Sequence, residues 1–433
     1  MLTNQKTKNL FEINGLDEAG LYLNNHRYGC FSYLFRPANT SKTIQRTHIS
    51  SELPETMATI ADSKYDDIWI SQCEFKFKSR LLVNLLRIPM SFIDLDTYRS
   101  KYADVSPEAM VPLLLQRCED SGIPAPSIIV FSGRGLQVKW LYDYALPARA
   151  LPRWNLSQQF LGDMFKDFGA DPAARDASRV LRVVGSVNQK SGETCRVVYF
   201  DDSTHSFDAL ADAVLPLTRD ELKQKREEAK KTPKKKFSVI EGGRTGNLKS
   251  FSRNQLAWDR LHDLRDLFEM RGGVAVGSRM VSLLWLLNFM CLSGQINSNT
   301  LLSSAHSLAH EIAPDWKLKE SELGTLKAKV EAYNNGERVT FNGKECVPLY
   351  TPKNAKLIEI FEITEEEQAK LKTIISPELA KTRRLERDKI RKVQERRENG
   401  ARSHADSERK RQPWEALGIS RATYYRKKKN GQI

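Results

Sequence analysis

Short apolar runs alternate with helical patterns over about the first 215 residues of the chain. The runs have the length of buried strands, and in the helical patterns an apolar residue returns every three or four positions. Strands are expected within Asp67–Ser71, Leu85–Asp94, Ser127–Phe131, Leu136–Tyr142 and Arg196–Phe200, and helices within Asp104–Gly122 and Arg153–Phe168. The pattern predicts a domain that mixes helices and strands.

The remainder of the chain is helical or charged. We divide the whole into a mixed domain at 1–218, a charged linker at 219–250, a small helical domain at 251–340, a charged helical connector at 341–400 and a basic segment at 401–433. The longest apolar run, Met280–Leu292, contains Ser and Asn and is too short to cross a bilayer. It predicts a buried helix, and we expect no membrane partner.

The basic segment has the outline of a helix-turn-helix. Pro413–Lys427 predicts a short helix, a turn at Gly418 and a second helix that Ser420 caps. The side chains expected to face DNA are Arg421, Thr423, Tyr424, Arg426, Lys427 and Lys428. A plain helical hairpin without a DNA ligand stays the alternative.

Positive charge is concentrated near the end of the chain. The 433 residues carry a formal net charge of +14, and residues 381–433 alone hold 18 Lys and Arg against 7 Asp and Glu. A basic tail on a nearly neutral body favours duplex DNA as a partner of the tail, although a solvated tail without a specific ligand would look the same. Six cysteines without a CxxC pair, and a polar start at Met1–Asn9, favour a cytoplasmic protein.

Two acids follow the apolar run that ends at Asp94. Asp94 and Asp96 are two positions apart, so on a strand they face the same side. Two adjacent carboxylates repel each other, and a divalent cation such as Mg²⁺ or Mn²⁺ relieves that repulsion. A third acid would come from Asp171 or Asp176. A helix cap for the first and a local salt bridge for the second are the plain alternatives.

Basic and amide side chains cluster beside these acids in the sequence. Ser132-Gly-Arg-Gly135 predicts a tight turn whose glycines allow close backbone approach, and Arg134 can grip phosphate. Gln137 and Lys139 share a face of the next strand. The donors suited to a triphosphate are Ser132, Arg134, Gln137, Lys139, Arg182, Asn188 and Lys190. An ordinary β-hairpin would explain the turn equally well.

These three clusters, in this order, resemble the motifs of the archaeo-eukaryotic primase superfamily, and in particular the RepB-type primases of plasmids and phages. Asp94 and Asp96 match its first motif, and Ser132 and Gln137 match the second, where many members have His in place of Gln137. The run that matches the third motif contains Arg179, Arg182, Gly185, Asn188 and Lys190. The resemblance covers roughly residues 60–205, and Trp69 and Arg80 look like its lead-in.

The resemblance implies an α+β fold, with a primase-polymerase (RRM-like) core followed by a small all-α domain. It also implies a DNA-templated primase with Asp94, Asp96 and Asp171 as catalytic, metal-binding acids. The expected partners are single-stranded DNA and nucleoside triphosphates. A separate helicase is expected as well, because the sequence has no GxxxxGK[ST] motif. A non-catalytic initiator that binds origin DNA through the helix-turn-helix remains the alternative.

Overall fold

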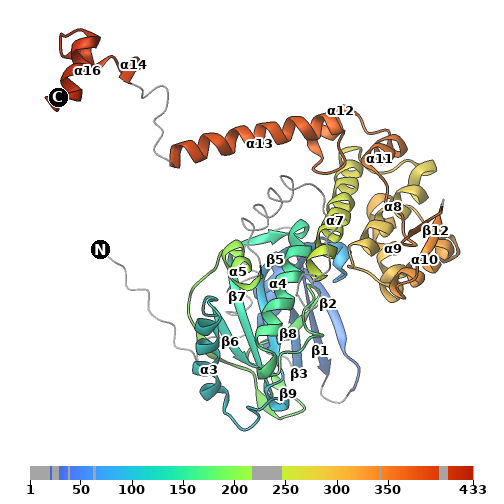
Figure 1. The fold of residues 1–433 in the computed structure, drawn as a ribbon. Helices are drawn as coiled ribbons and strands as arrows, with labels where there is room; N and C mark the ends of the chain where they lie inside the picture. Colours follow the sequence, from blue (N-terminus) through green and yellow to red (C-terminus); the bar gives the residue numbers. More distant parts are fainter. Residues whose placement is uncertain are drawn as a thin grey trace. The chain divides into compact units, whose positions relative to one another are not determined.

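The fold is taken from a computed structural model, which describes residues 20–21, 29–37, 40–61, 65–216, 246–341, 343–398 and 408–432 (Figure 1). Most of the predicted linker at 219–250 therefore lies outside the described residues. None of the helices in the described part of the chain is both long and apolar enough to cross a membrane.

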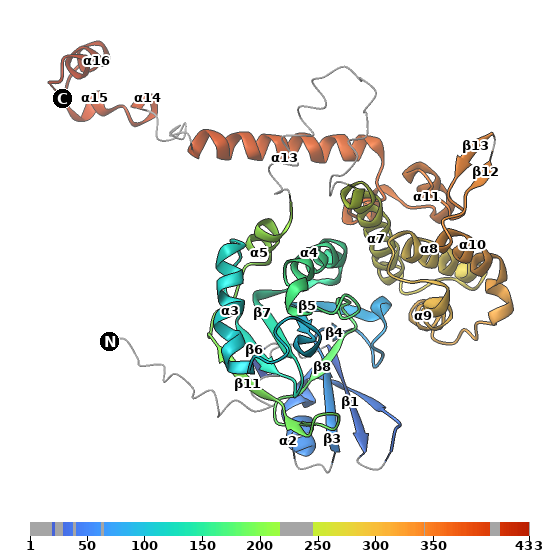
Figure 2. The same ribbon diagram turned by 60° about the horizontal axis from the view of Figure 1, so that its bottom comes forward.

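One nine-stranded sheet forms the centre of the N-terminal half. Its order is β11-β6-β7-β5-β4-β1-β3-β8, with β2 paired to β1 off this path, and its named strand pairs are antiparallel. The strands are β1 (Cys30–Pro37), β2 (Ile44–Ile49), β3 (Tyr65–Ser71), β4 (Glu74–Phe75), β5 (Leu85–Leu95), β6 (Ile128–Phe131), β7 (Leu136–Pro147), β8 (Val180–Arg182) and β11 (Arg196–Phe200). Figures 1 and 2 show the strands side by side, with helices packed along them.

Two helices accompany the middle of the sheet. In α3 (Pro107–Asp120), Ser106 caps the first turn by accepting from the backbone N–H of Ala109, as the Ser-Pro start predicts. In α4 (Leu151–Met164), the side-chain amide of Gln158 accepts from the backbone N–H of Phe92 and donates to its carbonyl. Phe92 lies in the part of β5 that is not paired with β4. These contacts fix the strand that delivers Asp94. The shorter helices α2 (Leu53–Ala61) and α5 (Phe207–Val214) complete this part.

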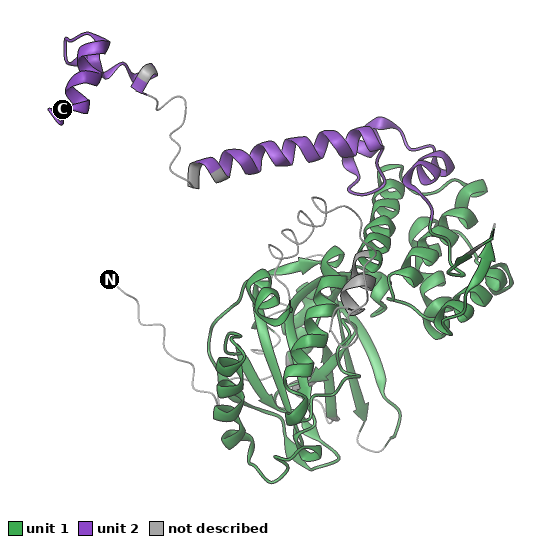
Figure 3. Cartoon of the chain, in the orientation of Figure 1, with its two compact units in different colours: residues 1–351 green, residues 352–433 purple. Residues whose placement is uncertain are grey.

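A helical block follows and packs against the sheet domain. It consists of α7 (Gly246–Met270), α8 (Arg279–Leu292), α9 (Ser298–Ile312) and α10 (Gly324–Asn334), followed by a hairpin of β12 (Val339–Phe341) and β13 (Lys344–Cys346). Arg149 pairs with the fully buried Asp263 at 3.1 Å, and the indole of Trp258 donates to the carbonyl of Ala148 at 2.8 Å. Both parts belong to one compact unit, Met1–Thr351 (Figure 3).

The second compact unit is Pro352–Ile433 (Figure 3). Its helices are α11 (Asn354–Phe361), α12 (Glu365–Lys370), the long charged α13 (Pro377–Glu398), α14 (Glu408–Arg411), α15 (Pro413–Ala416) and α16 (Arg421–Lys429). Ser420 caps α16 by accepting from the backbone N–H of Thr423, as expected.

The structure confirms the α+β class, with a largely helical block after the sheet domain. The buried helix predicted at Met280–Leu292 is α8. The finer domain boundaries and the DNA-binding character of the C-terminal helices remain predictions.

Candidate functional site

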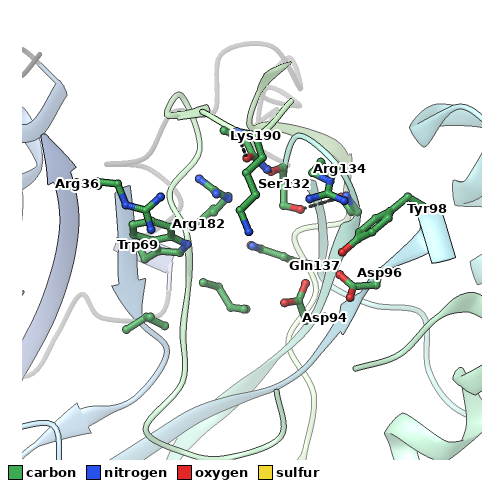
Figure 4. Close-up of a pocket in the computed structure, with 14 residues that line it drawn as sticks. Arg36, Trp69, Asp94, Asp96, Tyr98, Ser132, Arg134, Gln137, Arg182 and Lys190 are labelled. Carbon is green, nitrogen blue, oxygen red and sulfur yellow. Dashed lines mark hydrogen bonds between the residues drawn. The ribbon is translucent and has the colours of Figure 1, made fainter. Parts of the chain in front are cut away.

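One pocket collects most of the side chains that the sequence singles out. It has a volume of about 290 Å³ and lies between β5 and β7 on one side and β3 and β8 on the other (Figure 4). The predicted residues in its wall are Asp94, Asp96, Ser132, Arg134, Gln137, Arg182, Asn188 and Lys190. Segments far apart in the sequence therefore converge on one cavity.

The acids lie where β5 ends. Asp94 and Asp96 both line the pocket, and the carboxylate of Asp96 also pairs with Arg99 at 3.3 Å. The backbone N–H of Asp171 donates to the carbonyl of Asp94, and that of Asp96 donates to the carbonyl of Gly169, which pairs the two segments in antiparallel fashion. Opposed residues of an antiparallel pair point to the same face, so Asp171 is on the side of Asp94 and Asp96.

Asp176, the rival third acid, is engaged elsewhere. Its carboxylate accepts from the backbone and hydroxyl of Ser178 and pairs with Arg179 at 2.8 Å. Neither Asp176 nor Asp171 is in the pocket wall, and the carboxylate of Asp171 also accepts from the backbone N–H of Ala173 at 2.9 Å. What favours Asp171 as the third acid is its position opposite Asp94 in the strand pairing.

Electrostatics suit this end of β5 to a divalent cation. Burial, together with the negative charges of Asp96 and Asp171, raises the pKa of Asp94 to about 7 against the opposing effect of Arg179 and Lys139. A hard cation bound by carboxylate oxygens would relieve that repulsion. No group of three or more His, Cys, Asp or Glu side chains within the described ranges is already placed to hold a metal ion. The donor set fits Mg²⁺ or Mn²⁺ with two protein acids in the pocket and substrate oxygens completing the shell.

The hairpin turn reaches the acids because it contains glycine. A Cβ on Gly135 would collide with the carbonyl oxygen of Leu95, and one on Gly133, where φ is +86°, would lie 2.6 Å from Cβ of Asn188. Ser132 closes the turn by bonding the backbone of Gly135. The side-chain amide of Asn188 donates to the carbonyl of Ser132 at 2.9 Å. Asn188 therefore holds the turn while it lines the pocket.

Gln137 lines the pocket and has a buried side-chain acceptor without a partner in the described part of the chain. It is opposite Asp94 in the β5–β7 register, its side chain is 2% exposed, and its Oε1 has no hydrogen-bond partner among the described residues. A buried amide oxygen without a partner costs free energy, which a ligand donor or a bound water can recover. Figure 4 shows the Gln137 side chain reaching into the cavity near Lys190 and Asp94.

Lys139, predicted to contact a nucleotide, is not part of the pocket wall. It is fully buried two residues along β7, and its positive charge lowers the pKa of Asp94. Sequence alternation places it on the same face as Gln137, but the packing around it covers the side chain. Direct contact with a nucleotide remains a prediction for Lys139, whereas its charge balances the acids from within the protein.

Three further pocket residues were not assigned a role from the sequence: Arg36, Trp69 and Tyr98. Arg36 comes from β1, which the apolar pattern did not single out. Trp69 lies in the segment that resembles the family's lead-in. Tyr98 follows the acid pair directly, and the guanidinium of Arg134 stacks on its ring at 4.0 Å.

The residues predicted to bind DNA lie on α16. Arg421, Arg426 and Lys428 are exposed. Tyr424 packs its ring on Trp414, and Lys428 forms an ion pair with Glu408. Thr423 and Lys427 are half-buried, and the backbone of Thr423 serves the cap of the helix. The helix therefore offers an exposed basic surface, while Tyr424 packs on Trp414 of α15 and Thr423 contributes to the cap of its own helix.

Comparison with known proteins finds a similarity to a replication protein. It is 29% identical over 315 residues to a "Replication protein" of Clostridium perfringens, an alignment that covers 73% of this chain and 70% of that protein. No family model matches the chain.

Three solved structures show weaker similarity. The first is the AEP domain of the cyanophage S-2L primase-polymerase, with a TM-score of 0.35 and 16% identity over 48% of this chain and 100% of that one. The second is the catalytic domain of primase RepB′ in complex with initiator DNA, with a TM-score of 0.32 and 15% identity over 51% of this chain and 100% of that one. The third is primase RepB′, with a TM-score of 0.32 and 14% identity over 73% of this chain and 94% of that one. At TM-scores this low we draw nothing further from them. The Clostridium perfringens match agrees with the recognition that the three motifs suggested, since the chain is similar to a replication protein.

Proposed function

We propose that this protein is a DNA-templated primase, and that it serves the replication of a plasmid, a phage or another mobile element. The observation that carries the proposal is the pocket in which Asp94 and Asp96 face Arg182 and Lys190 (Figure 4). Acids suited to metal ions beside cations suited to phosphate are what nucleotidyl transfer requires. The relationship to a replication protein supports the same proposal.

Asp94, Asp96 and Asp171 would hold two Mg²⁺ or Mn²⁺ ions in this reaction. When bound, such ions neutralise phosphate charge and favour ionisation of the attacking hydroxyl. The acids supply hard oxygen ligands at the end of a rigid strand, fixed from behind by the Gln158 contacts to Phe92.

The cations and amides of the pocket would orient the nucleoside triphosphate. Lys190 and Arg182 neutralise phosphate oxygens, and Gln137 offers its unpartnered Oε1 to a donor on the nucleotide or to a bound water. Arg134 lies against Tyr98, so its guanidinium is held at the pocket wall and loses little freedom when it binds. Single-stranded DNA is the proposed template, and the basic C-terminal segment is the proposed contact to duplex DNA.

Primer synthesis on circular single-stranded DNA tests this proposal. The native protein and the Asp94→Ala/Asp96→Ala variant are incubated with labelled nucleotides and either Mg²⁺ or Mn²⁺. Metal-dependent products from the native protein alone are the expected result. DNA binding by both proteins without product from either would instead favour a replication initiator that binds origin DNA without synthesis. Equal product from both would refute the assignment of the acids.

A further inference from the structure

A buried carboxylate behind the pocket accepts hydrogen bonds from two arginines that line the pocket. Asp67 on β3 has no exposed surface. Its Oδ2 accepts from Nη1 of Arg36 at 3.0 Å, and its Oδ1 accepts from Nη1 of Arg182 and from the backbone N–H of Gln189. Three donors therefore satisfy one carboxylate, which repays its removal from water.

The sheet register explains why these groups meet. Strand β3 lies between β1 and β8, with Arg36 paired to Asp67 and Trp69 paired to Arg182. Asp67 and Trp69 are two residues apart on β3, so both face the same side. Cross-strand partners face that side as well. Arg36 on β1 and Arg182 on β8 therefore both contact Asp67 and Trp69 of the strand between them.

The indole of Trp69 fixes the two guanidiniums in orientation. The guanidinium carbons lie 5.5 Å (Arg36) and 4.8 Å (Arg182) from the ring centroid, within the range of cation–π attraction. The side chains remain 27% and 11% exposed, and both line the pocket with Trp69 (Figure 4). The Nε of Arg36 has no hydrogen-bond partner within the described part of the chain. Each guanidinium thus has an ordered position at the pocket wall.

We propose that Asp67 is a positioning residue, which holds Arg36 and Arg182 on Trp69 as a two-arginine clamp for the polyphosphate tail of the nucleotide. The inference rests on the proposed function and deepens it. Two guanidiniums against one carboxylate leave one positive charge, and Lys190 in the same wall adds a second. This net positive charge suits an anionic polyphosphate. Asp67 itself cannot reach the ligand because it is fully buried.

Without its charge the clamp loses its order. Two guanidiniums that share no counterion repel each other, and each regains rotamer freedom that binding must then remove. Asp67→Asn keeps the shape of the side chain and removes the charge. We expect it to weaken polyphosphate binding on the order of ten- to a hundredfold. Loss of a residue that hydrogen-bonds to a metal ligand and orients it has an effect of this size on metal affinity.

Calorimetry with inorganic tripolyphosphate and Mg²⁺ tests the clamp in the full-length chain, without a need for synthesis. Asp263→Asn is the matched control, because Asp263 is also a fully buried aspartate paired with an arginine, Arg149, but lies outside the pocket. The control should bind tripolyphosphate within about twofold of the native protein. Thermal melting of both variants measures any loss of folded protein. The double variant Arg36→Gln/Arg182→Gln should weaken binding as well, and Asp67→Asn should add little to it, because Asp67 acts through these two arginines.

The outcomes separate the clamp from the function. Native-like tripolyphosphate binding by Asp67→Asn, equal weakening by Asp263→Asn, or no binding by the native protein would each overturn the clamp. Where synthesis is measurable, Asp67→Asn should raise the KM for nucleotides and change kcat by less than about threefold, which a general loosening of the sheet would not reproduce. Loss of tripolyphosphate binding in Asp67→Asn without any synthesis by the native protein would keep the clamp and refute the primase.

Discussion

Glu74 should make the stability of the sheet domain fall as the pH rises. The side chain is fully buried between β5 and β1, with Arg87 opposite it in the register. Burial raises the pKa of Glu74 to about 8 from 4.5, despite the nearby charge of Arg87 and a hydrogen bond from Ser50. One carboxylate oxygen has no partner among the described residues, which fits a protonated carboxyl group at neutral pH.

The sign and size follow from proton linkage. A carboxyl group whose pKa is raised by folding stabilises the protein fully below its unfolded pKa, and the contribution disappears as the pH rises towards the folded pKa. With the two values above, the loss between pH 5 and pH 9 is about 4 kcal/mol, at 1.36 kcal/mol per pKa unit. Glu74→Gln, which cannot ionise, should therefore be the more stable protein at pH 9 by a similar amount.

Chemical unfolding at a series of pH values measures this difference. The matched control is Glu108→Gln, because Glu108 is exposed and a hydrogen bond from Arg196 lowers its pKa. Removing Glu108 should change the pH profile only in the acid range, and in the opposite direction. A native protein and a Glu74→Gln variant with parallel stability profiles from pH 5 to pH 9 would refute the reasoning.

Three further predictions follow from the site. Gly135→Ala should abolish synthesis and destabilise the fold by more than about 2 kcal/mol, because its Cβ would collide with the Leu95 carbonyl, whereas Gly277→Ala has open space and should be near neutral in melting and activity assays. Asp171→Asn should remove metal-dependent synthesis while Asp176→Asn keeps most of it; the reverse order would exchange the third acid. Deleting 400–433 should weaken duplex DNA binding at least about tenfold in a salt-dependent manner, but leave priming on short single strands intact; loss of priming would place the tail in the catalytic unit.

The sequence predicted those site residues that local rules control. Residues two apart on a strand share a face, so Asp94 and Asp96 could be paired before any fold was known. The turn at Ser132–Gly135 likewise follows from its glycines. Gln137 was predicted on the strand that follows this turn, but its position opposite Asp94 comes from the pairing of β7 with β5.

What the sequence could not supply depends on contacts between distant segments. Arg36 reaches the pocket only because β1 pairs with β3 in one particular register, and no local signal specifies that register. The burial of Lys139 depends in the same way on the layers packed around β7, since alternation gives its face but not what covers it. The preference for Asp171 over Asp176, which remains a prediction, rests on the pairing of residues 169–171 with the end of β5.

The acid pair is held where two glycines allow other backbone segments to approach it. Gly135 brings the hairpin turn against the carbonyl of Leu95, and Gly169, with φ at +86°, brings the segment of Asp171 against the carbonyl of Asp96, where a Cβ would lie 2.5 Å away. Gathering three carboxylates in this way opposes folding, since their charges repel at a largely buried site. Such local conflict with the rules of stability is characteristic of sites built to bind a charged partner. A cation that these carboxylates bind would therefore complete the electrostatic balance that the strand end lacks alone.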